Sequence, residues 1–290
     1  MAEESCHGSC HGSCLCGTLQ WRIEKPIRMT HCHCSMCRKA HGAPFATILC
    51  VAPENLHFES GADNVVYFES SPGYRRAFCA TCGSCAPVDF DGEMDIPAGC
   101  LDGDPGSRPI RHIFVASKAP WHAIGGGLPQ LATYEDDGGG ASVERPDPGP
   151  AKEGVLRGSC LCGGAAYEVS GEIGPIFNCH CTRCRKARAA AHTTNGFVAA
   201  AALRYVRGAE LIRRYKVPEA KAFSQSFCSR CGSGMPHAGV SEGKAAIPLG
   251  SLDDDPGRGA DCHIFVGSKA VWYEIEDGLP QFEERPPSKG

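Results

Sequence analysis

The sequence GSCLCG at residues 12–17 returns without a change at residues 158–163, and it marks an internal duplication. Three more segments repeat in the same order: CHCSMCRKA at 32–40 as CHCTRCRKA at 179–187, FCATCGS at 78–84 as FCSRCGS at 227–233, and the 35 residues 96–130 as 247–281, identical at 21 positions. Each copy has about 130 residues, the size of a domain rather than of a solenoid repeat. The sequence therefore predicts two tandem domains.

The boundaries follow from the composition between the copies. Residues 136–150 read DDGGGASVERPDPGP, a Gly/Pro/Asp-rich stretch with almost nothing to bury. Such a stretch is typical of a linker. We predict a first domain over residues 9–135, a linker over 136–153 and a second domain over 154–286.

Length and charge exclude several classes of protein. The 290 residues are 42% apolar, enough for each copy to bury a core. The formal charge is -4 and no run of Lys and Arg exceeds two, which argues against a nucleic-acid partner. No apolar run approaches the roughly 18 residues of a membrane helix. Residues 1–14 lack the basic and apolar segments of a secretion signal, so we expect a cytoplasmic protein without a membrane partner.

Cysteine is the abnormal residue, with 20 in the chain. In a reducing compartment this number indicates metal ligation or redox chemistry rather than disulfides. The duplication separates the cysteines, because each can be checked against the equivalent position of the other copy. Six have no counterpart: Cys6, Cys10, Cys50, Cys85, Cys100 and Cys262. The other fourteen form seven pairs and belong to the repeated design.

Eight of the fourteen form C-x-C and C-x-x-C knuckles about 60 residues apart, the usual arrangement of a closed tetrahedral zinc site. The glycine after each knuckle permits the positive φ that turns backbone N–H groups toward sulfur. We predict one structural zinc in each copy, on Cys14, Cys16, Cys79 and Cys82, and on Cys160, Cys162, Cys228 and Cys231. The alternatives are two disulfides per copy, thiols that pack as small apolar groups, or an iron–sulfur cluster, although no ferredoxin spacing is present.

The remaining six form C-x-C-x-x-C in each copy: Cys32, Cys34 and Cys37, and Cys179, Cys181 and Cys184. Three thiolates from one tight loop hold a metal on one side and leave a fourth position for water or substrate, as in catalytic zinc sites. We therefore predict a second zinc in each copy, up to four per chain. A histidine could instead close the site. His31, His33 and His180 are nearest, but Asn178 replaces His31 in the second copy, and we expect the other two to point away.

Basic pairs follow the last of these cysteines, Arg38 with Lys39 and Arg185 with Lys186. They could bind the carboxylate of a substrate through charge-assisted hydrogen bonds, or be ordinary solvated cations. No general base is evident from the sequence, and the catalytic residues stay unknown. The repeated acidic residues, Asp102, Asp104, Asp253 and Asp255, lie in LDxDPG segments and are expected to shape turns.

The secondary structure is expected to be mainly β. Residues 18–24 (TLQWRIE) and 64–70 (NVVYFES) alternate apolar and polar side chains, as strands do, and HIFV is a short β-rich run in both copies. The best helical candidate is the short SMCRKAHG at 35–42. We predict small, coiled sheets with few short helices, pinned by metal.

The motifs GSCLCG, CHCxxCRKA and FCxxCGS, with the HIFV–SKA–W–GLPQ tail, resemble the glutathione-dependent formaldehyde-activating enzymes and their relative centromere protein V. The resemblance covers both copies. It implies a β-tent fold with two zincs per domain, one structural and one on C-x-C-x-x-C near which glutathione binds. It also implies a carbon–sulfur lyase type of reaction, in which the glutathione thiol adds reversibly to formaldehyde and gives S-hydroxymethylglutathione.

Two other functions are compatible with the same motifs. A non-catalytic zinc module could bind a ligand or a partner, as related β-tent proteins do. A metal or redox buffer is suggested by the CHGSCHGSC start, where Cys6, His7, Cys10 and His11 could capture a further ion. The copies also differ after CRKA: Arg188 stands at the position equivalent to His41, and His192 at the position equivalent to Phe45. One copy or both could therefore be active.

Overall fold

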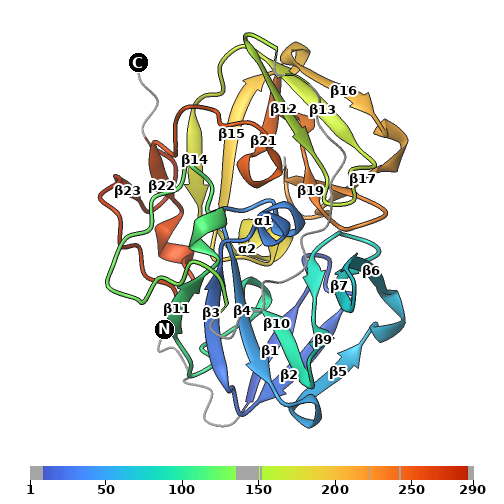
Figure 1. Ribbon diagram of the computed structural model, residues 1–290. Helices are drawn as coiled ribbons and strands as arrows, with labels where there is room; N and C mark the ends of the chain where they lie inside the picture. Colours follow the sequence, from blue (N-terminus) through green and yellow to red (C-terminus); the bar gives the residue numbers. More distant parts are fainter. Residues whose placement is uncertain (1–8, 135–149, 151, 222, 242, 287–290) are drawn as a thin grey trace.

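The computed structural model describes residues 9–134, 150, 152–221, 223–241 and 243–286. Each copy builds three sheets of its own, and no sheet mixes strands from the two copies (Figure 1). The first copy lies in the lower half of Figure 1 and the second in the upper half, with both α-helices at the centre where the halves meet. The prediction of a mainly β fold of small sheets with few short helices is confirmed.

The sheets of the first copy have the following strand orders: β1 (Ser9–Ser13), β2 (Gln20–Glu24) and β5 (Leu56–Ser60); β11 (Pro109–Ile113), β3 (Arg28–Cys32), β4 (Ala46–Val51), β10 (Glu93–Pro97) and β9 (Val88–Phe90); β6 (Val65–Ser71), β7 (Tyr74–Cys79) and β8 (Cys85–Ala86). The helix α1 (Ser35–His41) connects β3 to β4. Only the β11–β3 pairing is parallel, and it carries the HIFV segment to the strand that ends at Cys32.

The second copy repeats this plan: β12 (Val155–Ser159), β13 (Ala166–Ser170) and β16 (Leu203–Arg207); β20 (His237–Ser241), β21 (Lys244–Pro248), β15 (Thr193–Ala199), β14 (Ile176–Cys179), β22 (Cys262–Ile264) and β23 (Gln281–Phe282); β17 (Ile212–Lys216), β18 (Ser224–Cys228) and β19 (Gly234–Met235). The helix α2 (Thr182–Arg188) connects β14 to β15. Single 3₁₀ turns join other strands, among them η3 (Ala98–Cys100) and η7 (Leu249–Ser251).

The local patterns produced the expected elements. The alternating segment at 18–24 gives β2, where Trp21 and Ile23 are buried and the three polar residues of the strand are not. The segment at 64–70 gives β6, and SMCRKAHG gives α1, which ends at Gly42 in the left-handed conformation that glycine favours. The predicted domain boundaries stay a prediction, and most of the expected linker lies outside the described residues.

The hydrophobic cores, in contrast to the sheets, are shared between the copies. Trp272 of the second copy packs into the core of the first, and Trp121 of the first packs against the core of the second. Phe78 and Phe227 meet at the interface with their ring centroids 6.4 Å apart. A Cβ on Gly83 would lie 2.3 Å from the Phe227 ring of the second copy. Glycine is therefore needed here for two reasons, the close approach of that ring and the φ of +74°.

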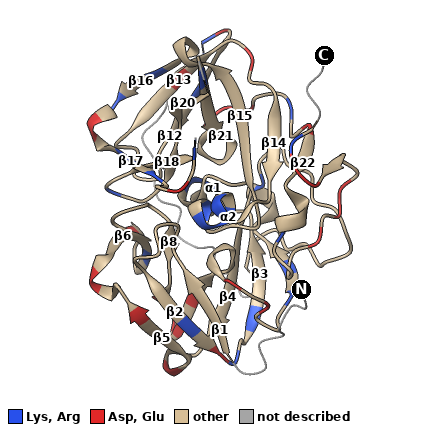
Figure 2. Ribbon diagram, turned by 180° about the vertical axis from the view of Figure 1, so that it is seen from behind, with Lys and Arg blue, Asp and Glu red and all other residues tan. Residues whose placement is uncertain are grey.

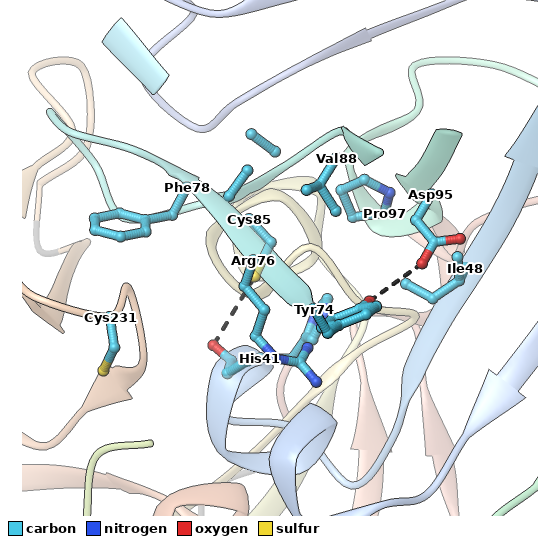
Figure 3. A pocket seen from close by; sticks show the side chains of 13 residues that line it. His41, Ile48, Tyr74, Arg76, Phe78, Cys85, Val88, Asp95, Pro97 and Cys231 are labelled. Atoms are coloured by element: carbon cyan, nitrogen blue, oxygen red, sulfur yellow. Dashed lines mark hydrogen bonds between the residues drawn. The ribbon is translucent and has the colours of Figure 1, made fainter. Parts of the chain in front are cut away.

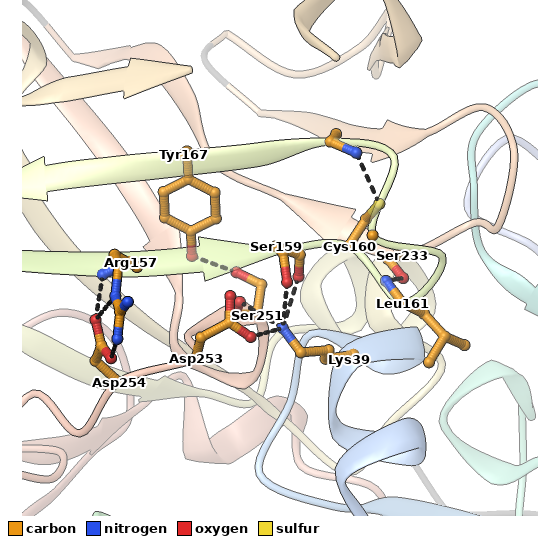
Figure 4. A network of polar contacts seen from close by, with 12 residues as sticks. Lys39, Arg157, Ser159, Cys160, Leu161, Tyr167, Ser233, Ser251, Asp253 and Asp254 are labelled. Atoms are coloured by element: carbon orange, nitrogen blue, oxygen red, sulfur yellow. Dashed lines mark hydrogen bonds and ion pairs between the residues drawn. The ribbon is translucent and has the colours of Figure 1, made fainter. Parts of the chain in front are cut away.

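Two lysines hold the copies together reciprocally. The Lys39 ammonium on α1 lies 2.6 Å from Asp253 and donates to the Ser159 carbonyl and hydroxyl at 2.8 and 3.0 Å and to the Ser251 carbonyl at 3.2 Å (Figure 4). Lys186 on α2 makes the equivalent contacts with the first copy: its ammonium lies 2.5 Å from Asp102 and donates to the Ser13 hydroxyl. With a side chain only 5% exposed, Lys39 is stabilised by these acceptors of the second copy.

We predict that Lys39→Met lowers the free energy of unfolding by about 2–4 kcal/mol, because Asp253 and two carbonyl groups then lose a buried donor. Chemical denaturation followed by circular dichroism measures the change. The matched control is Lys152→Met, since Lys152 is 60% exposed and its ion pair with Glu168 contributes less than about 1 kcal/mol. Equal effects of the two substitutions would contradict the interlocking role.

Candidate metal centres

The structure brings together the eight cysteines predicted as structural ligands, in two separate clusters. In each cluster all four sulfur atoms lie within 4.8 Å of one another. The clusters are Cys14, Cys16, Cys79 and Cys82 in the first copy, and Cys160, Cys162, Cys228 and Cys231 in the second. The C-x-C knuckle follows the first strand of each copy, and the C-x-x-C knuckle follows β7 or β18.

The spacing of these sulfur atoms fits a tetrahedral ion. The Cys14 and Cys16 sulfurs are 3.4 Å apart and those of Cys162 and Cys228 are 3.9 Å apart. A zinc ion with four sulfurs at about 2.3 Å would separate them by about 3.8 Å, whereas a disulfide needs about 2.05 Å. The cysteines are free thiols in the structure, so the disulfide alternative finds no support.

Polar groups around each four-thiolate cluster face sulfur. In the first copy the Leu19 N–H donates to Cys14 Sγ at 3.3 Å, and the Asn64 amide donates to Cys79 Sγ at 3.3 Å. In the second copy the Ala165 N–H donates to Cys160 Sγ at 3.2 Å. Such donors stabilise negative charge on sulfur, and the glycine after each knuckle has a φ between +68° and +74° as expected.

The other six cysteines form two clusters of three at the start of the helices. The clusters are Cys32, Cys34 and Cys37 next to α1, and Cys179, Cys181 and Cys184 next to α2. The middle cysteine is the N-cap, because Cys34 Sγ accepts the Cys37 N–H at 3.3 Å and Cys181 Sγ accepts the Cys184 N–H at 3.5 Å. One sulfur of each cluster therefore occupies the position where a side-chain acceptor normally begins a helix.

Negative charge collects first on this N-cap sulfur. Hydrogen bonds from Cys179 and Cys184 lower the pKa of Cys181 to about 3. Those from Cys32 and Cys37 hold the pKa of Cys34 well below its usual range. A thiolate is the form of cysteine that binds a metal, so the N-cap sulfur is the ligand of each cluster that loses its proton most readily.

No fourth protein ligand joins the three-thiolate clusters within the part of the chain that the structure describes. His33 and His180, each placed between two of the cysteines, point away as expected. His33 shares a 2.9 Å hydrogen bond with His112, and His180 shares a 2.8 Å bond with His263. Burial lowers the pKa of His33 to about 3, so this imidazole is neutral at physiological pH.

His31, the third candidate for a fourth ligand, also has another partner. Its Nδ1 shares a 2.9 Å hydrogen bond with the Thr47 hydroxyl, and it belongs to no metal cluster among the described residues. A metal bound to either three-thiolate cluster would therefore keep one position for water or substrate.

The basic pairs beside these clusters divide into two kinds. The ammonium groups of Lys39 and Lys186 bind the opposite copy, as described above, so Asp102 and Asp253 do more than shape turns. Arg38 is partly exposed and its Nη2 lies 3.4 Å from the Ser117 carbonyl. Arg185 is 9% exposed, and its Nε is buried without a hydrogen-bond partner among the described residues. Figure 2 shows these helices as a basic centre between the copies.

Three features of the site did not follow from the sequence. His112 and His263 support the histidines of the C-x-C motifs, and Asp277 lies 3.0 Å from His263 Nε2. The repeated H of HIFV is the signal that could have indicated the first two. Arg76 reaches Cys37, with its Nη2 3.6 Å from the sulfur.

A small pocket is lined in part by Tyr74, Arg76 and Asp95 (Figure 3), and Arg76 also reaches Cys37. Its volume of about 30 Å³ accommodates water rather than a larger substrate. Burial raises the pKa of Asp95 to about 6, and the Tyr74 hydroxyl donates to this carboxylate at 3.2 Å. These three side chains give the pocket a polar lining, and Arg76 connects it to the first three-thiolate cluster.

The cysteines without a counterpart take no part in these clusters among the described residues. Cys10 is buried in the core, whereas His11 on the same strand is exposed and 3.3 Å from Glu59. Cys6 and His7 lie outside the described residues. Within the described ranges, no helix combines the length and the apolar composition needed to cross a membrane.

Comparison with known proteins assigns both copies to one family. The family model described as glutathione-dependent formaldehyde-activating enzyme matches residues 9–117 and 155–268, more than half of the chain. A protein of Halomonas elongata named "Putative glutathione-dependent formaldehyde-activating enzyme" is 31% identical over 137 residues, covering 43% of this chain and 81% of the relative. A crystal structure of a Rhodobacter sphaeroides protein aligns with 20% identity and a TM-score of 0.30, covering 43% of this chain and 98% of that one.

We predict that Cys79→Ser reduces the zinc content of the loaded protein by one ion per chain and destabilises the fold by several kcal/mol. Serine is a poor ligand for zinc, and the binding energy of a structural metal is folding energy. Native mass spectrometry counts the ions, and denaturation measures stability. Cys50→Ser is the control, because Cys50 is 6% exposed but belongs to no cluster. An unchanged zinc content in Cys79→Ser would refute the site.

Proposed function

Since the chain belongs to the family of glutathione-dependent formaldehyde-activating enzymes, we propose that it catalyses the reversible addition of the glutathione thiol to formaldehyde. The reaction centres are the three-thiolate clusters at α1 and α2. The observation that supports this assignment best is the contrast between the clusters, since two offer four thiolates and two offer three without a further ligand from the described residues. A closed site stabilises a fold, and an open one accepts a substrate.

The metal in this proposal is zinc, held by Cys14, Cys16, Cys79 and Cys82, by the equivalent four residues of the second copy, and by the two three-thiolate clusters. Zinc bound at a three-thiolate cluster would act as a Lewis acid that favours a bound thiolate or polarises an aldehyde oxygen. With four zinc ions and fourteen thiolates, the formal charge would change from -4 to about -10.

The chemistry requires one bond to form and one proton to move. The sulfur of glutathione bonds to the formaldehyde carbon, the π electrons of the carbonyl pass to its oxygen, and that oxygen takes the proton lost by the thiol. The product is S-hydroxymethylglutathione, and no atom or electron is left over. A thiol adds to formaldehyde unaided, so the protein contributes orientation and a stabilised thiolate rather than a large change in mechanism.

Recognition of glutathione in this proposal uses its carboxylates. Arg38 and Arg185 stand one turn beyond the N-cap cysteines, where a guanidinium can bind a carboxylate through two parallel hydrogen bonds. Lys39 and Lys186 contribute through position, because their contacts with the opposite copy hold the two helices. Burial lowers the pKa of Arg185, and a carboxylate partner would offset that cost.

We expect the wild-type protein to accelerate exchange between formaldehyde and its glutathione adduct, and the Cys34→Ser/Cys181→Ser variant to show only the spontaneous rate. Both substitutions remove the N-cap thiolate of an open cluster while leaving the four-thiolate clusters intact. Two-dimensional exchange spectroscopy with ¹³C-formaldehyde measures the rate. The single variants show whether one copy or both are active.

The control for this experiment is Cys262→Ser, which alters a buried cysteine outside the clusters and should leave the exchange rate unchanged. Each sample is analysed for zinc, with four ions expected in the wild type and two in the double variant. A zinc-loaded wild-type protein that does not exceed the spontaneous rate would contradict the assignment to formaldehyde and favour a non-catalytic zinc module.

A further inference from the structure

Besides Arg38 and Arg185, which follow the last cysteine of each cluster, a further arginine lies near each three-thiolate cluster, and it comes from a different position in each copy. In the first copy it is Arg76 on β7, whose equivalent in the second copy is Gln225 on β18. In the second copy it is Arg188 at the end of α2, whose equivalent in the first copy is His41. Each copy therefore has one further arginine near its cluster, at a different position of the repeat.

Arg76 contacts the thiolate cluster of the first copy directly. Its Nη2 donates to Cys37 Sγ at 3.6 Å, and its Nε donates to the Ser70 hydroxyl at 3.1 Å. The guanidinium carbon of Arg76 lies 5.1 Å from the centre of the Tyr74 ring (Figure 3). Among the described residues its hydrogen bonds thus go to a sulfur and a hydroxyl rather than to a carboxylate.

Arg188 approaches the second cluster from the helix itself. It follows Cys184 by four residues, so the two side chains share one face of α2. Its guanidinium fills the space that a side chain would need at position 234, since a Cβ on Gly234 would lie 1.5 Å from Arg188 Nη1. The equivalent residue of the first copy is Cys85. The arginine and the glycine that makes room for it therefore occur together.

No carboxylate pairs with Arg188 among the residues that the structure describes. The residue is 6% exposed, and Nη1 has no hydrogen-bond partner among the described residues. Burial lowers the pKa of Arg188 to about 10, and Cys184 is the group that opposes this most strongly. At neutral pH the guanidinium is thus charged in a site where an unpaired charge is costly, which requires an anion nearby.

A metal–thiolate cluster would be such an anion, because three thiolates and one Zn²⁺ leave a net negative charge. Arg76 contacts the first cluster at Cys37, and Arg188 lies one helical turn after Cys184 of the second. His41 adds no second cation in the first copy, because burial lowers its pKa and its Nδ1 hydrogen-bonds to the Arg188 carbonyl at 2.8 Å. Gln225 is neutral, and its amide donates to the Cys82 carbonyl at 3.1 Å.

We propose that Arg76 and Arg188 are equivalent positioning residues, each of which balances the charge of the three-thiolate metal cluster of its own copy and thereby sets its affinity for zinc. The proposal deepens the proposed function, since it rests on zinc at these clusters. It explains why two non-equivalent sequence positions carry arginine and why glycine at position 234 replaces the cysteine found at the equivalent position 85. It also explains why the half-buried Arg76 and the buried Arg188 have no carboxylate partner among the described residues.

The first test removes each charge. Arg76→Gln and Arg188→His give each site the residue found in the other copy, and each should raise the zinc dissociation constant of its own three-thiolate cluster about 10-fold or more. Competition with a chromophoric chelator measures the affinity, and native mass spectrometry counts the ions retained. Arg75→Gln is the matched control, because the neighbouring Arg75 is 51% exposed and pairs with Asp89.

The second test transplants the arrangement of one copy into the other. His41→Arg/Arg76→Gln/Cys85→Gly gives the first copy the arginine, the glutamine and the space found in the second. We expect this variant to recover zinc affinity to within about threefold of the wild type. Retention of both structural zinc ions and an unchanged circular dichroism spectrum show in each case that the fold is intact.

The proposal would be overturned by wild-type zinc affinity in Arg76→Gln and Arg188→His, or by a folded triple variant that binds zinc no better than Arg76→Gln. Because the readout is metal affinity, loss of zinc in the single variants supports the proposal even where the wild-type protein fails to accelerate the glutathione–formaldehyde reaction. That failure would contradict the proposed function alone.

Discussion

Repulsion between clustered thiolates is the constraint on which this structure depends. Four sulfur atoms that all lie within 4.8 Å of one another cannot all be ionised without a cation among them, and ionised sulfur is the form that binds metal strongly. The sheets are small, three to six strands each; the C-x-C knuckle joins two strands of one sheet and the C-x-x-C knuckle joins two strands of another. A metal ion at each four-thiolate cluster would therefore tie two sheets of one copy together.

The same constraint separates the two kinds of cluster. A four-thiolate cluster satisfies a tetrahedral ion, whereas the three-thiolate clusters at α1 and α2 lack a fourth ligand among the described residues. Both open clusters lie where the copies interlock, because Lys39 and Lys186 tie the two helices to the opposite copy. The fusion of two copies thus sets the position of each helix that begins at an N-cap cysteine. It also brings Arg188, from the second copy, against the His41 side chain of the first.

The sequence predicted the cysteine clusters and the mainly β fold, because knuckle spacing and strand alternation are local properties that the duplication displays twice. It did not predict that Trp121 and Trp272 each pack against the core of the other copy, nor that Lys39 binds Asp253. Contacts between distant segments depend on how the copies pack. Arg76 and Arg188 were missed for a different reason. Comparison of the copies selects residues that are the same at equivalent positions, and these two arginines occupy positions that are not equivalent.

X-ray absorption at the zinc edge tests the central claim most directly, which is that each copy holds one closed and one open metal centre. For the zinc-loaded full chain we predict four ions, an average of about 3.5 sulfur ligands per zinc at about 2.3 Å, and a shell of light atoms near 2.0 Å that glutathione diminishes as its sulfur binds. Two ions per chain, each with four sulfur ligands and no light-atom shell, would contradict the account.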